Sequence, residues 1–291
     1  MKLPHSSNSK GLMNALTIDV EDYFQVSALA PHFPKEVWNA TPCRVERNVD
    51  RILEMLVQHG ARGTFFTLGW IAERYPELVR RIANEGHELA SHGYAHERAS
   101  SQSPEAFLAD IRLAKVVLED IAGCEVRGYR APSFSVGLAN PWAHGCIEEA
   151  GYAYSSSVYP VKHDHYGVPD APRFPYAVGA GLVEIPITTV RRFGRNWPVG
   201  GGGYFRLLPY PVSAWGIRKV NKEDRKPAIF YFHPWEIDPG QPVVREASAK
   251  TRFRHYVNLA HTEARLRRLL QDFAWGRMDE VFLPVESSGS A

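Results

Sequence analysis

The sequence alternates short apolar runs with longer stretches whose apolar side chains recur at helical spacing, and this alternation constrains the fold more than any other feature. The predicted strands lie at residues 15–20, 63–69, 86–91, 125–130, 152–160, 183–186 and 228–232. Helices are predicted between them at residues 41–60, 70–84, 103–121 and 141–151. Strands that are joined through helices pair in parallel with right-handed crossovers. The sequence therefore predicts an α/β fold whose parallel strands form a (β/α) barrel.

Length and composition agree with one such barrel. The chain has 291 residues, of which 44% are hydrophobic, and this is enough for a single large core. We expect one domain at residues 15–286 that includes a C-terminal helical extension. Residues 1–14 are expected to form a flexible leader, and residues 287–291 a disordered tail.

Charge and cysteine content exclude several classes of function. The formal net charge of +2 gives no electrostatic case for nucleic-acid binding. Cys43, Cys124 and Cys146 are too widely spaced for a zinc knuckle or a disulfide framework. The polar first residues lack the apolar region of a signal peptide, and no window is apolar enough for a membrane span. We therefore expect a cytoplasmic protein, and the sequence leaves its oligomeric state open.

Metal-binding residue types follow two of the predicted strands. The first strand ends in three acids within four residues, Asp19, Glu21 and Asp22, and such crowded charges favour a cation. His92 and His96 follow the third strand, and imidazoles four residues apart face one point if the segment makes a helical turn. The carboxyl ends of parallel strands lie at one face of a barrel, so one acid can complete a three-ligand metal site. Glu21 and Asp22 remain alternatives for that ligand, and a solvated histidine pair is the structural alternative.

Two later strand ends carry further candidates for catalysis. Arg130 ends the fourth strand and is followed by Ala131, Pro132 and Ser133. Pro132 has no N–H, whereas the N–H of Ser133 can point at a developing oxyanion. His233 follows the buried strand at residues 228–232, so it also lies at a predicted strand end.

A glycine run marks the possible binding region for a ligand. Four consecutive glycines at residues 200–203 let a backbone pass close to a ligand, and a flexible lid is the alternative interpretation. Aromatic faces suit sugar rings. The predicted substrate contacts are therefore Trp197, Tyr204 and Trp235.

Taken in order, the motifs resemble carbohydrate esterase family four, the NodB-homology polysaccharide deacetylases. Three motifs carry the resemblance: Thr-Ile-Asp-Val-Glu-Asp from Thr17, Ser-His-Gly-Tyr-Ala-His from Ser91, and Arg-Ala-Pro-Ser from Arg130. The likeness extends over roughly residues 16–234. The family uses a distorted (β/α) barrel and a divalent metal to remove N- or O-acetyl groups from sugars. The Phe-His-Pro-Trp-Glu segment at His233 is similar to a branch that accompanies bacterial exopolysaccharide biosynthesis.

The resemblance implies a role for each matching residue and an acetylated sugar or polysaccharide as the substrate. Asp19 corresponds to the general base, Arg130 to the group that orients it, His233 to the general acid, and the Ser133 N–H to part of the oxyanion site. The implied metal, most simply zinc, is held by His92 and His96 with Glu21 or Asp22. The family commonly has two adjacent aspartates where this chain inserts Val20, so the third ligand stays open. An aspartate is also usual at the place of Ser155.

Two rival functions are compatible with the same barrel. The first is a metal-independent amidohydrolase that resembles allantoinase, because the change around Val20 and Glu21 could leave the site without an ion. The second is a catalytically silent barrel that binds carbohydrate. Binding alone would not require Asp19, Arg130 and His233 together, which favours the deacetylase.

Overall fold

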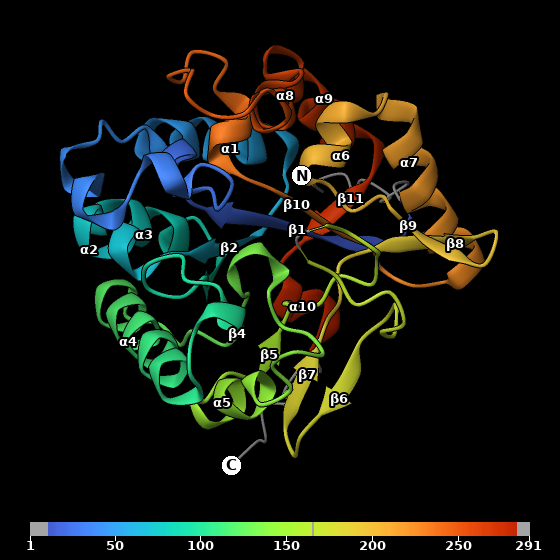
Figure 1. Ribbon diagram of the computed structural model, residues 1–291. Coiled ribbons are helices and arrows are strands. Elements are labelled where there is room, and N and C mark those ends of the chain that lie inside the picture. The colour runs from blue at the N-terminus through green and yellow to red at the C-terminus, as the bar shows by residue number, and fades with distance from the viewer. Residues whose placement is uncertain (1–10, 165, 284–291) are drawn as a thin grey trace, which may run out of the picture.

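A curled sheet forms the centre of the computed structural model, which describes residues 11–164 and 166–283 (Figure 1). The sheet consists of β1 (Met13–Val20), β2 (Thr64–Thr67), β3 (Glu88–Ser91), β4 (Gly128–Tyr129), β5 (Tyr154–Ser155), β6 (Tyr176–Val178), β7 (Leu182–Glu184), β10 (Ile229–Phe232) and β11 (Ala274–Gly276). Its order is β10-β1-β2-β3-β4-β5-β7-β6, with β11 beside β1. Each pairing is parallel except that of β6 with β7.

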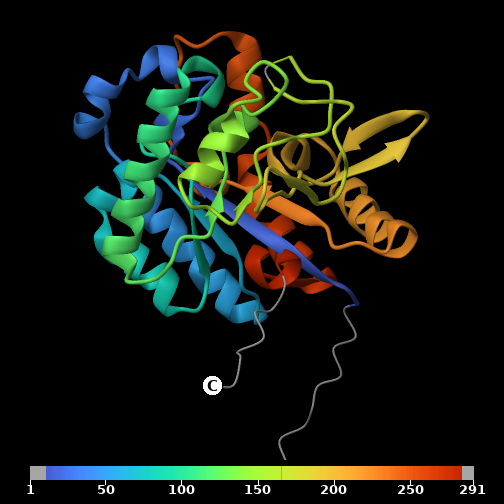
Figure 2. The same ribbon diagram turned by 90° about the horizontal axis from the view of Figure 1, so that it is seen from below.

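Helices surround the sheet, as the two views in Figures 1 and 2 show. They are α1 (Val45–His59), α2 (Gly69–Arg74), α3 (Pro76–Asn84), α4 (Pro104–Ala122), α5 (Ala143–Glu149), α6 (Gly202–Leu207), α7 (Tyr210–Lys219), α8 (Ala249–Tyr256), α9 (Leu259–Asp272) and α10 (Met278–Phe282). The hydrogen-bonded path runs from β10 to β6 without closing, so the barrel is a half-barrel. The predicted α/β fold with one domain and a parallel sheet is confirmed.

The predicted leader and tail can be compared with the structure only in part. β1 begins at Met13, inside the predicted leader of residues 1–14. Residues 1–10 and the predicted tail at 287–291 lie outside the described residues. Within residues 11–164 and 166–283, no helix combines the length and apolar character that a bilayer crossing requires.

Several element boundaries differ from the sequence prediction for local reasons. The single helix predicted at residues 70–84 is two helices, α2 and α3, because Pro76 has no N–H to continue the first. The strand predicted at residues 152–160 is reduced to Tyr154–Ser155. A hairpin of β8 (Thr189–Arg192) and β9 (Arg195–Pro198), together with β6 and β11, was not predicted. Each of these strands spans at most four residues, too few for a clear alternating pattern.

Successive side chains of β1 point to opposite faces of the sheet, so one strand contributes to both the core and the site. Leu16, Ile18 and Val20 pack into the apolar core that includes side chains of α1 and α9. Ala15 belongs to a second cluster on the other face, with residues of β2, β3 and β10. Successive side chains of a strand point to opposite faces, so Asp19 shares the interior face with Ala15. The interior of the half-barrel therefore becomes polar at the carboxyl end of β1.

Candidate metal and catalytic site

Glu21, His92 and His96 form a compact group at the carboxyl ends of β1 and β3. One ligand atom from each lies within 4.8 Å of the others, and the side chains come from segments about 70 residues apart in the chain. Glu21 Oε2 lies 2.6 Å from His96 Nε2, and the two imidazole centroids are 5.3 Å apart. The predicted convergence of a carboxylate with both histidines is therefore present.

The loop from His92 to His96 brings its imidazoles together without the helical turn that the sequence suggested. Gly93 has φ 78° and His96 has φ 54°, so the backbone enters the left-handed region twice. A Cβ on Gly93 would lie 2.9 Å from Asp110 Oδ2, which accepts a hydrogen bond from the Tyr94 N–H. Glycine is needed at this position because the loop turns directly over that carboxylate.

Asp22, the alternative third ligand, uses both of its carboxylate oxygens in hydrogen bonds outside the ligand group. Its Oδ1 accepts from the Tyr23 N–H at 2.7 Å. Its Oδ2 accepts from Cys43 Sγ at 2.9 Å, from the Val45 N–H at 2.8 Å and from the Arg44 N–H. These donors open α1, so Asp22 caps that helix from a distance. Asp22 lies outside the ligand group, and the geometry favours Glu21.

The donor atoms of the group fit a divalent metal. Glu21 Oε1 accepts from Trp235 Nε1 at 3.1 Å, whereas the buried Oε2 faces His96 Nε2 inside the ligand group. His92 Nδ1 lies 2.8 Å from the Arg130 carbonyl, which leaves Nε2 as the nitrogen available for a metal. Two imidazoles and one carboxylate are a ligand set typical of catalytic zinc.

The electrostatics of the group also suit a cation. Burial lowers the pKa of His92 to about 4, so the imidazole is neutral at physiological pH, as a metal ligand must be. Burial raises the pKa of Glu21, but electrostatic interactions with His96 and His233 outweigh burial and hold that pKa well below its usual range. Glu21 is therefore a carboxylate.

Asp19 and Arg130 form a buried ion pair beside the group. Arg130 Nη1 donates to Asp19 Oδ1 at 2.5 Å and to Thr17 Oγ1 at 2.8 Å. Its Nε and Nη2 donate to the carbonyl and hydroxyl of Ser156, and its guanidinium lies 4.0 Å from the ring centroid of Phe66. Arg130 is fully buried, so the surface-charge alternative does not apply. One carboxylate oxygen of Asp19 is thereby fixed.

His233 follows β10 and faces both carboxylates. Its Nε2 lies 3.6 Å from Glu21 Oε1 and 3.9 Å from Asp19 Oδ2, and its Nδ1 lies 2.6 Å from Glu236 Oε1. Burial lowers the pKa of His233, but the carboxylates of Glu21 and Glu236 outweigh burial and raise that pKa to about 9. Sequence reasoning did not single out Glu236, although its place three residues after His233 was a usable signal.

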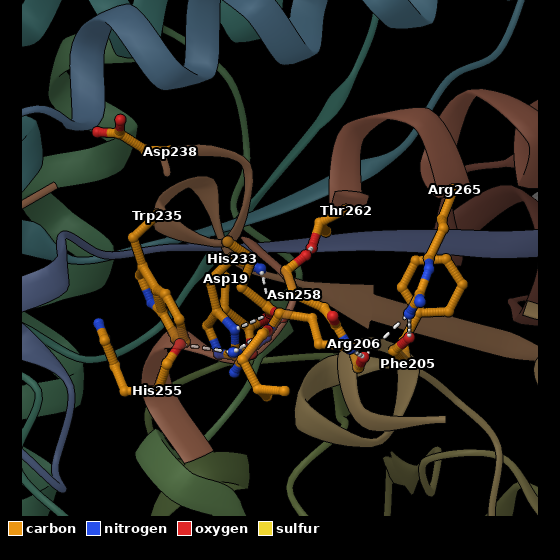
Figure 3. Close-up of polar contacts among 12 residues, drawn as sticks. Asp19, Phe205, Arg206, His233, Trp235, Asp238, His255, Asn258, Thr262 and Arg265 are labelled. Carbon is orange, nitrogen blue, oxygen red and sulfur yellow. Dashed lines mark hydrogen bonds and ion pairs between the residues drawn. The ribbon is translucent and has the colours of Figure 1, made fainter. Parts of the chain in front are cut away.

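The remaining predicted residues lie in different settings. Trp235, predicted to contact substrate, is buried, and its ring lies between those of His233 and His255, so a role as a sugar platform does not fit (Figure 3). Trp197 is 52% exposed on β9 and donates from Nε1 to the Arg192 carbonyl. Tyr204 is half-buried on α6. Ser133 has φ 56°, and its hydroxyl lies 2.8 Å from that of Ser27.

Comparison with protein families divides the chain into two adjacent segments. Residues 37–154 match the family described as Polysaccharide deacetylase. Residues 156–283 match a family described as a domain of unknown function, DUF3473. The boundary between the two matches falls at β5, inside the sheet.

Curated relatives and a solved structure extend this comparison. A Bacillus cereus peptidoglycan-N-acetylglucosamine deacetylase is 37% identical over 82 residues, which cover 28% of this chain and 30% of that protein. A chitooligosaccharide deacetylase of Azorhizobium caulinodans is 34% identical over 82 residues, covering 28% and 39%. The chain thus spans less than half the length of these relatives. The crystal structure of a candidate polysaccharide deacetylase from Mycobacterium smegmatis shares the fold, with a TM-score of 0.63, 21% identity, and coverage of 96% and 92%. Residues 37–154 of this chain are therefore similar to the polysaccharide deacetylase family, and the whole chain shares the fold of the Mycobacterium smegmatis protein.

Proposed function

We propose that this protein removes acetyl groups from an acetylated carbohydrate with the help of a divalent metal bound by Glu21, His92 and His96. The observation that carries the proposal is the position of Asp19 and His233 next to those ligands. His233 Nε2 lies less than 4 Å from both Glu21 Oε1 and Asp19 Oδ2. A base, an acid and a metal within reach of one acetyl group are the groups that amide hydrolysis requires.

The metal that we expect is zinc, because two imidazoles and a carboxylate suit its preference for nitrogen and oxygen ligands. When bound, zinc would supply Lewis-acid activation of water and of the acetyl carbonyl. Glu21 carries an extra constraint, since Trp235 donates to its Oε1 and so directs Oε2 toward the histidines.

Asp19 is the proposed base that accepts the proton of the attacking water. Arg130 holds Oδ1 of this carboxylate, so Oδ2 is the oxygen that faces His233 and the ligand group. The Ser133 N–H is the proposed donor to the oxyanion that develops on the acetyl oxygen. Both roles rest on the positions of these residues at the ends of β1 and β4 and on the family motifs.

His233 is the proposed acid that protonates the leaving nitrogen. An amine is a poor leaving group unless it is protonated. The contact of Nδ1 with Glu236 leaves Nε2 as the nitrogen that faces the reacting group.

The proposed substrate is an N-acetylated amino sugar within a polysaccharide or its precursor, such as a bacterial exopolysaccharide under synthesis. The names of the curated relatives refer to peptidoglycan N-acetylglucosamine and to chitooligosaccharide, which support an N-acetyl rather than an O-acetyl group. Trp197 and Tyr204 remain the proposed sugar contacts. Trp235 is not included because its ring is covered on both faces.

The two rival functions are less well supported. A metal-independent amidohydrolase would not account for the convergence of Glu21, His92 and His96, whose ligand atoms all lie within 4.8 Å of one another. A silent carbohydrate-binding barrel would bury the Asp19–Arg130 pair without using it, and such a pair contributes little net stability.

The test is an assay of acetate release from an N-acetylglucosamine oligomer by the purified protein, before and after removal of metal with a chelator. We expect turnover that a chelator abolishes and added zinc restores. Turnover that survives complete metal removal would support the metal-independent rival. Binding of the oligomer with no turnover in the presence of zinc would support the silent barrel.

A further inference from the structure

We propose that Arg206 and Glu236 are positioning residues for the imidazole of His233, and that this is what residues 156–283, which match a family of unknown function, add to the site. The proposal rests on the deacetylation proposed above. It assigns to this half of the chain the task of fixing the proton donor, while the amino-terminal half holds the metal and the base.

Glu236 holds His233 through two contacts to one carboxylate oxygen. Its Oε1 accepts from the backbone N–H of His233 at 3.1 Å and lies 2.6 Å from Nδ1 of the same residue. Both contacts are made within one short 3-10 turn, Pro234–Ile237. Glu236 is 1% exposed, so water does not compete for these contacts. They fix the ring orientation and leave Nδ1 as the protonated nitrogen.

Arg206 holds the other oxygen of Glu236. Its Nε donates to Glu236 Oε2 at 2.6 Å, and its Nη1 donates to the His255 carbonyl at 2.5 Å (Figure 3). Arg206 is 3% exposed and lies on α6. The guanidinium therefore fixes the carboxylate against the backbone of α8.

The glycine run explains how α6 comes close enough to do this. A Cβ on Gly201 would lie 2.0 Å from the Tyr231 carbonyl oxygen, and one on Gly202 would lie 2.3 Å from the Tyr231 hydroxyl. Gly201 also forms a parallel β-bridge with Tyr231, which belongs to β10. The run therefore permits contact between α6 and β10, so neither a ligand loop nor a flexible lid is needed to account for Gly201 and Gly202.

Trp235 connects this arrangement to the metal group. Its ring stacks on His233 with centroids 5.2 Å apart and on His255 with centroids 4.3 Å apart, while the Arg206 guanidinium lies 4.9 Å from it. Its Nε1 donates to Glu21 Oε1. The stack in Figure 3 thus sets the plane of the His233 ring, while Glu236 sets its tautomer.

A purely structural role explains the Arg206–Glu236 ion pair less well. Buried ion pairs contribute little to stability because desolvation offsets their attraction. Here, one oxygen of the carboxylate serves the imidazole and the other serves the guanidinium. The fixed carboxylate of Glu236 therefore orients the imidazole of His233, whose Nε2 faces Asp19 and Glu21.

The first experiment observes the His233 imidazole by nitrogen-15 NMR in the metal-free protein, independently of turnover. We expect a protonated Nδ1 in the wild type and a shifted or exchange-broadened Nδ1 signal in Glu236→Gln and Arg206→Lys. Arg173→Lys is the control, because Arg173 Nη2 forms a partly buried ion pair with Asp224 Oδ2 at 2.8 Å in the same half of the chain, outside the site. An Nδ1 signal that is unchanged in Glu236→Gln overturns the proposal.

The second experiment compares an N-acetylglucosamine oligomer with 4-nitrophenyl acetate, whose leaving group needs no proton. We expect Glu236→Gln to lower turnover of the oligomer about a hundredfold and that of the ester less than about threefold. For Arg206→Lys we expect about a tenfold loss on the oligomer, since lysine cannot make both contacts. Metal content should not change in either variant.

A double variant separates action through His233 from any other effect. In a His233→Ala background, Glu236→Gln should cause no further loss on the oligomer. Equal losses on both substrates, or losses that add fully to that of His233→Ala, would overturn the positioning role. An inactive wild type would instead remove the proposed function, while the NMR comparison would still decide whether Glu236 and Arg206 position the ring.

Discussion

The two halves of the chain contribute to the site by different means. In the amino-terminal half, residues 11–154, the functional side chains follow the ends of parallel strands of one sheet: Glu21 after β1, His92 after β3 and Arg130 after β4. In the carboxyl-terminal half, residues 156–283, His233 also follows a strand, but Glu236 and Arg206 fix its ring. The first arrangement depends on backbone pairing and the second on side-chain contacts, so substitutions in the two halves should have different signatures.

The largest effect should come from the metal ligands of the amino-terminal half. His92→Ala is expected to abolish both metal binding and turnover of every acetylated substrate, because a histidine ligand is lost. Metal analysis of the dialysed protein and an acetate-release assay measure this. Asp19→Asn is the companion variant: it should keep the metal and lose about a hundredfold to ten-thousandfold in turnover. A His92→Ala protein with full metal content would disprove the ligand assignment.

A selective effect should come from the acid in the carboxyl-terminal half. His233→Ala should reduce turnover of an N-acetyl sugar by about a hundredfold or more, because its amine cannot leave unprotonated. Turnover of an activated aryl acetate should fall far less. The ratio of the two rates is the measurement. Equal losses would mean that His233 supports the metal or the barrel, and the distinction between the halves would fail.

The third prediction concerns the two neighbouring acids after β1. Asp22→Asn should lower the free energy of unfolding by about 1–3 kcal/mol, because the carboxylate that accepts from the start of α1 is lost. Urea unfolding measures this, and metal content should stay at the wild-type level. Glu21→Gln is the matched control, expected to lose metal instead. If Asp22→Asn lost the metal, Asp22 would be a ligand after all.

The smallest effect is a pH dependence of stability in the amino-terminal half, away from the site. Burial lowers the pKa of His87 to about 4, with repulsion from Arg62 and Arg277 in the same direction. Between about pH 6.5 and 4 the unfolded chain therefore binds more protons than the folded chain, so stability should fall as the pH drops, by at most about 1.4 kcal/mol per pH unit.

The wild type and His87→Gln separate this contribution from other titrating groups. The difference between their free energies of unfolding should change through the window from pH 6.5 to 4 and stay constant above it. Urea denaturation at a series of pH values gives that difference. A difference that is independent of pH would show that His87 is not buried in its neutral form.

The sequence was sufficient for the architecture because the long periodic segments carry their own signals. The run from Val45 to Leu56 and the buried strands β1, β2 and β10 were predicted as the structure has them, within a few residues. Short strands such as β6 and β11 were missed because they are specified by pairing with β7 and β1, which no local pattern encodes. The break at Pro76 could have been predicted from its missing N–H.

The site divides in the same way. Side chains at strand ends were predictable, since the parallel sheet brings those ends to one face. The choice between Glu21 and Asp22 required the structure, because it depends on where the start of α1 lies. Arg206 gave no signal, since its partner is 30 residues away. Trp235 was misassigned for a related reason: its neighbour His255 comes from a distant helix, and burial by such a residue is not visible in sequence.

The position of β1 between β10 and β2 has a consequence for the order in which the protein acquires activity as it is made. Thr17 and Phe230, which bond across β1 and β10, are separated by 213 residues. At a synthesis rate of about 5–20 residues per second, roughly 10 to 40 s pass between their appearance on the ribosome. The metal ligands and Asp19 have all been made long before that, yet β1 lacks one neighbour until β10 emerges. A nascent chain that already contains all the proposed metal ligands therefore still lacks His233, its proposed proton donor.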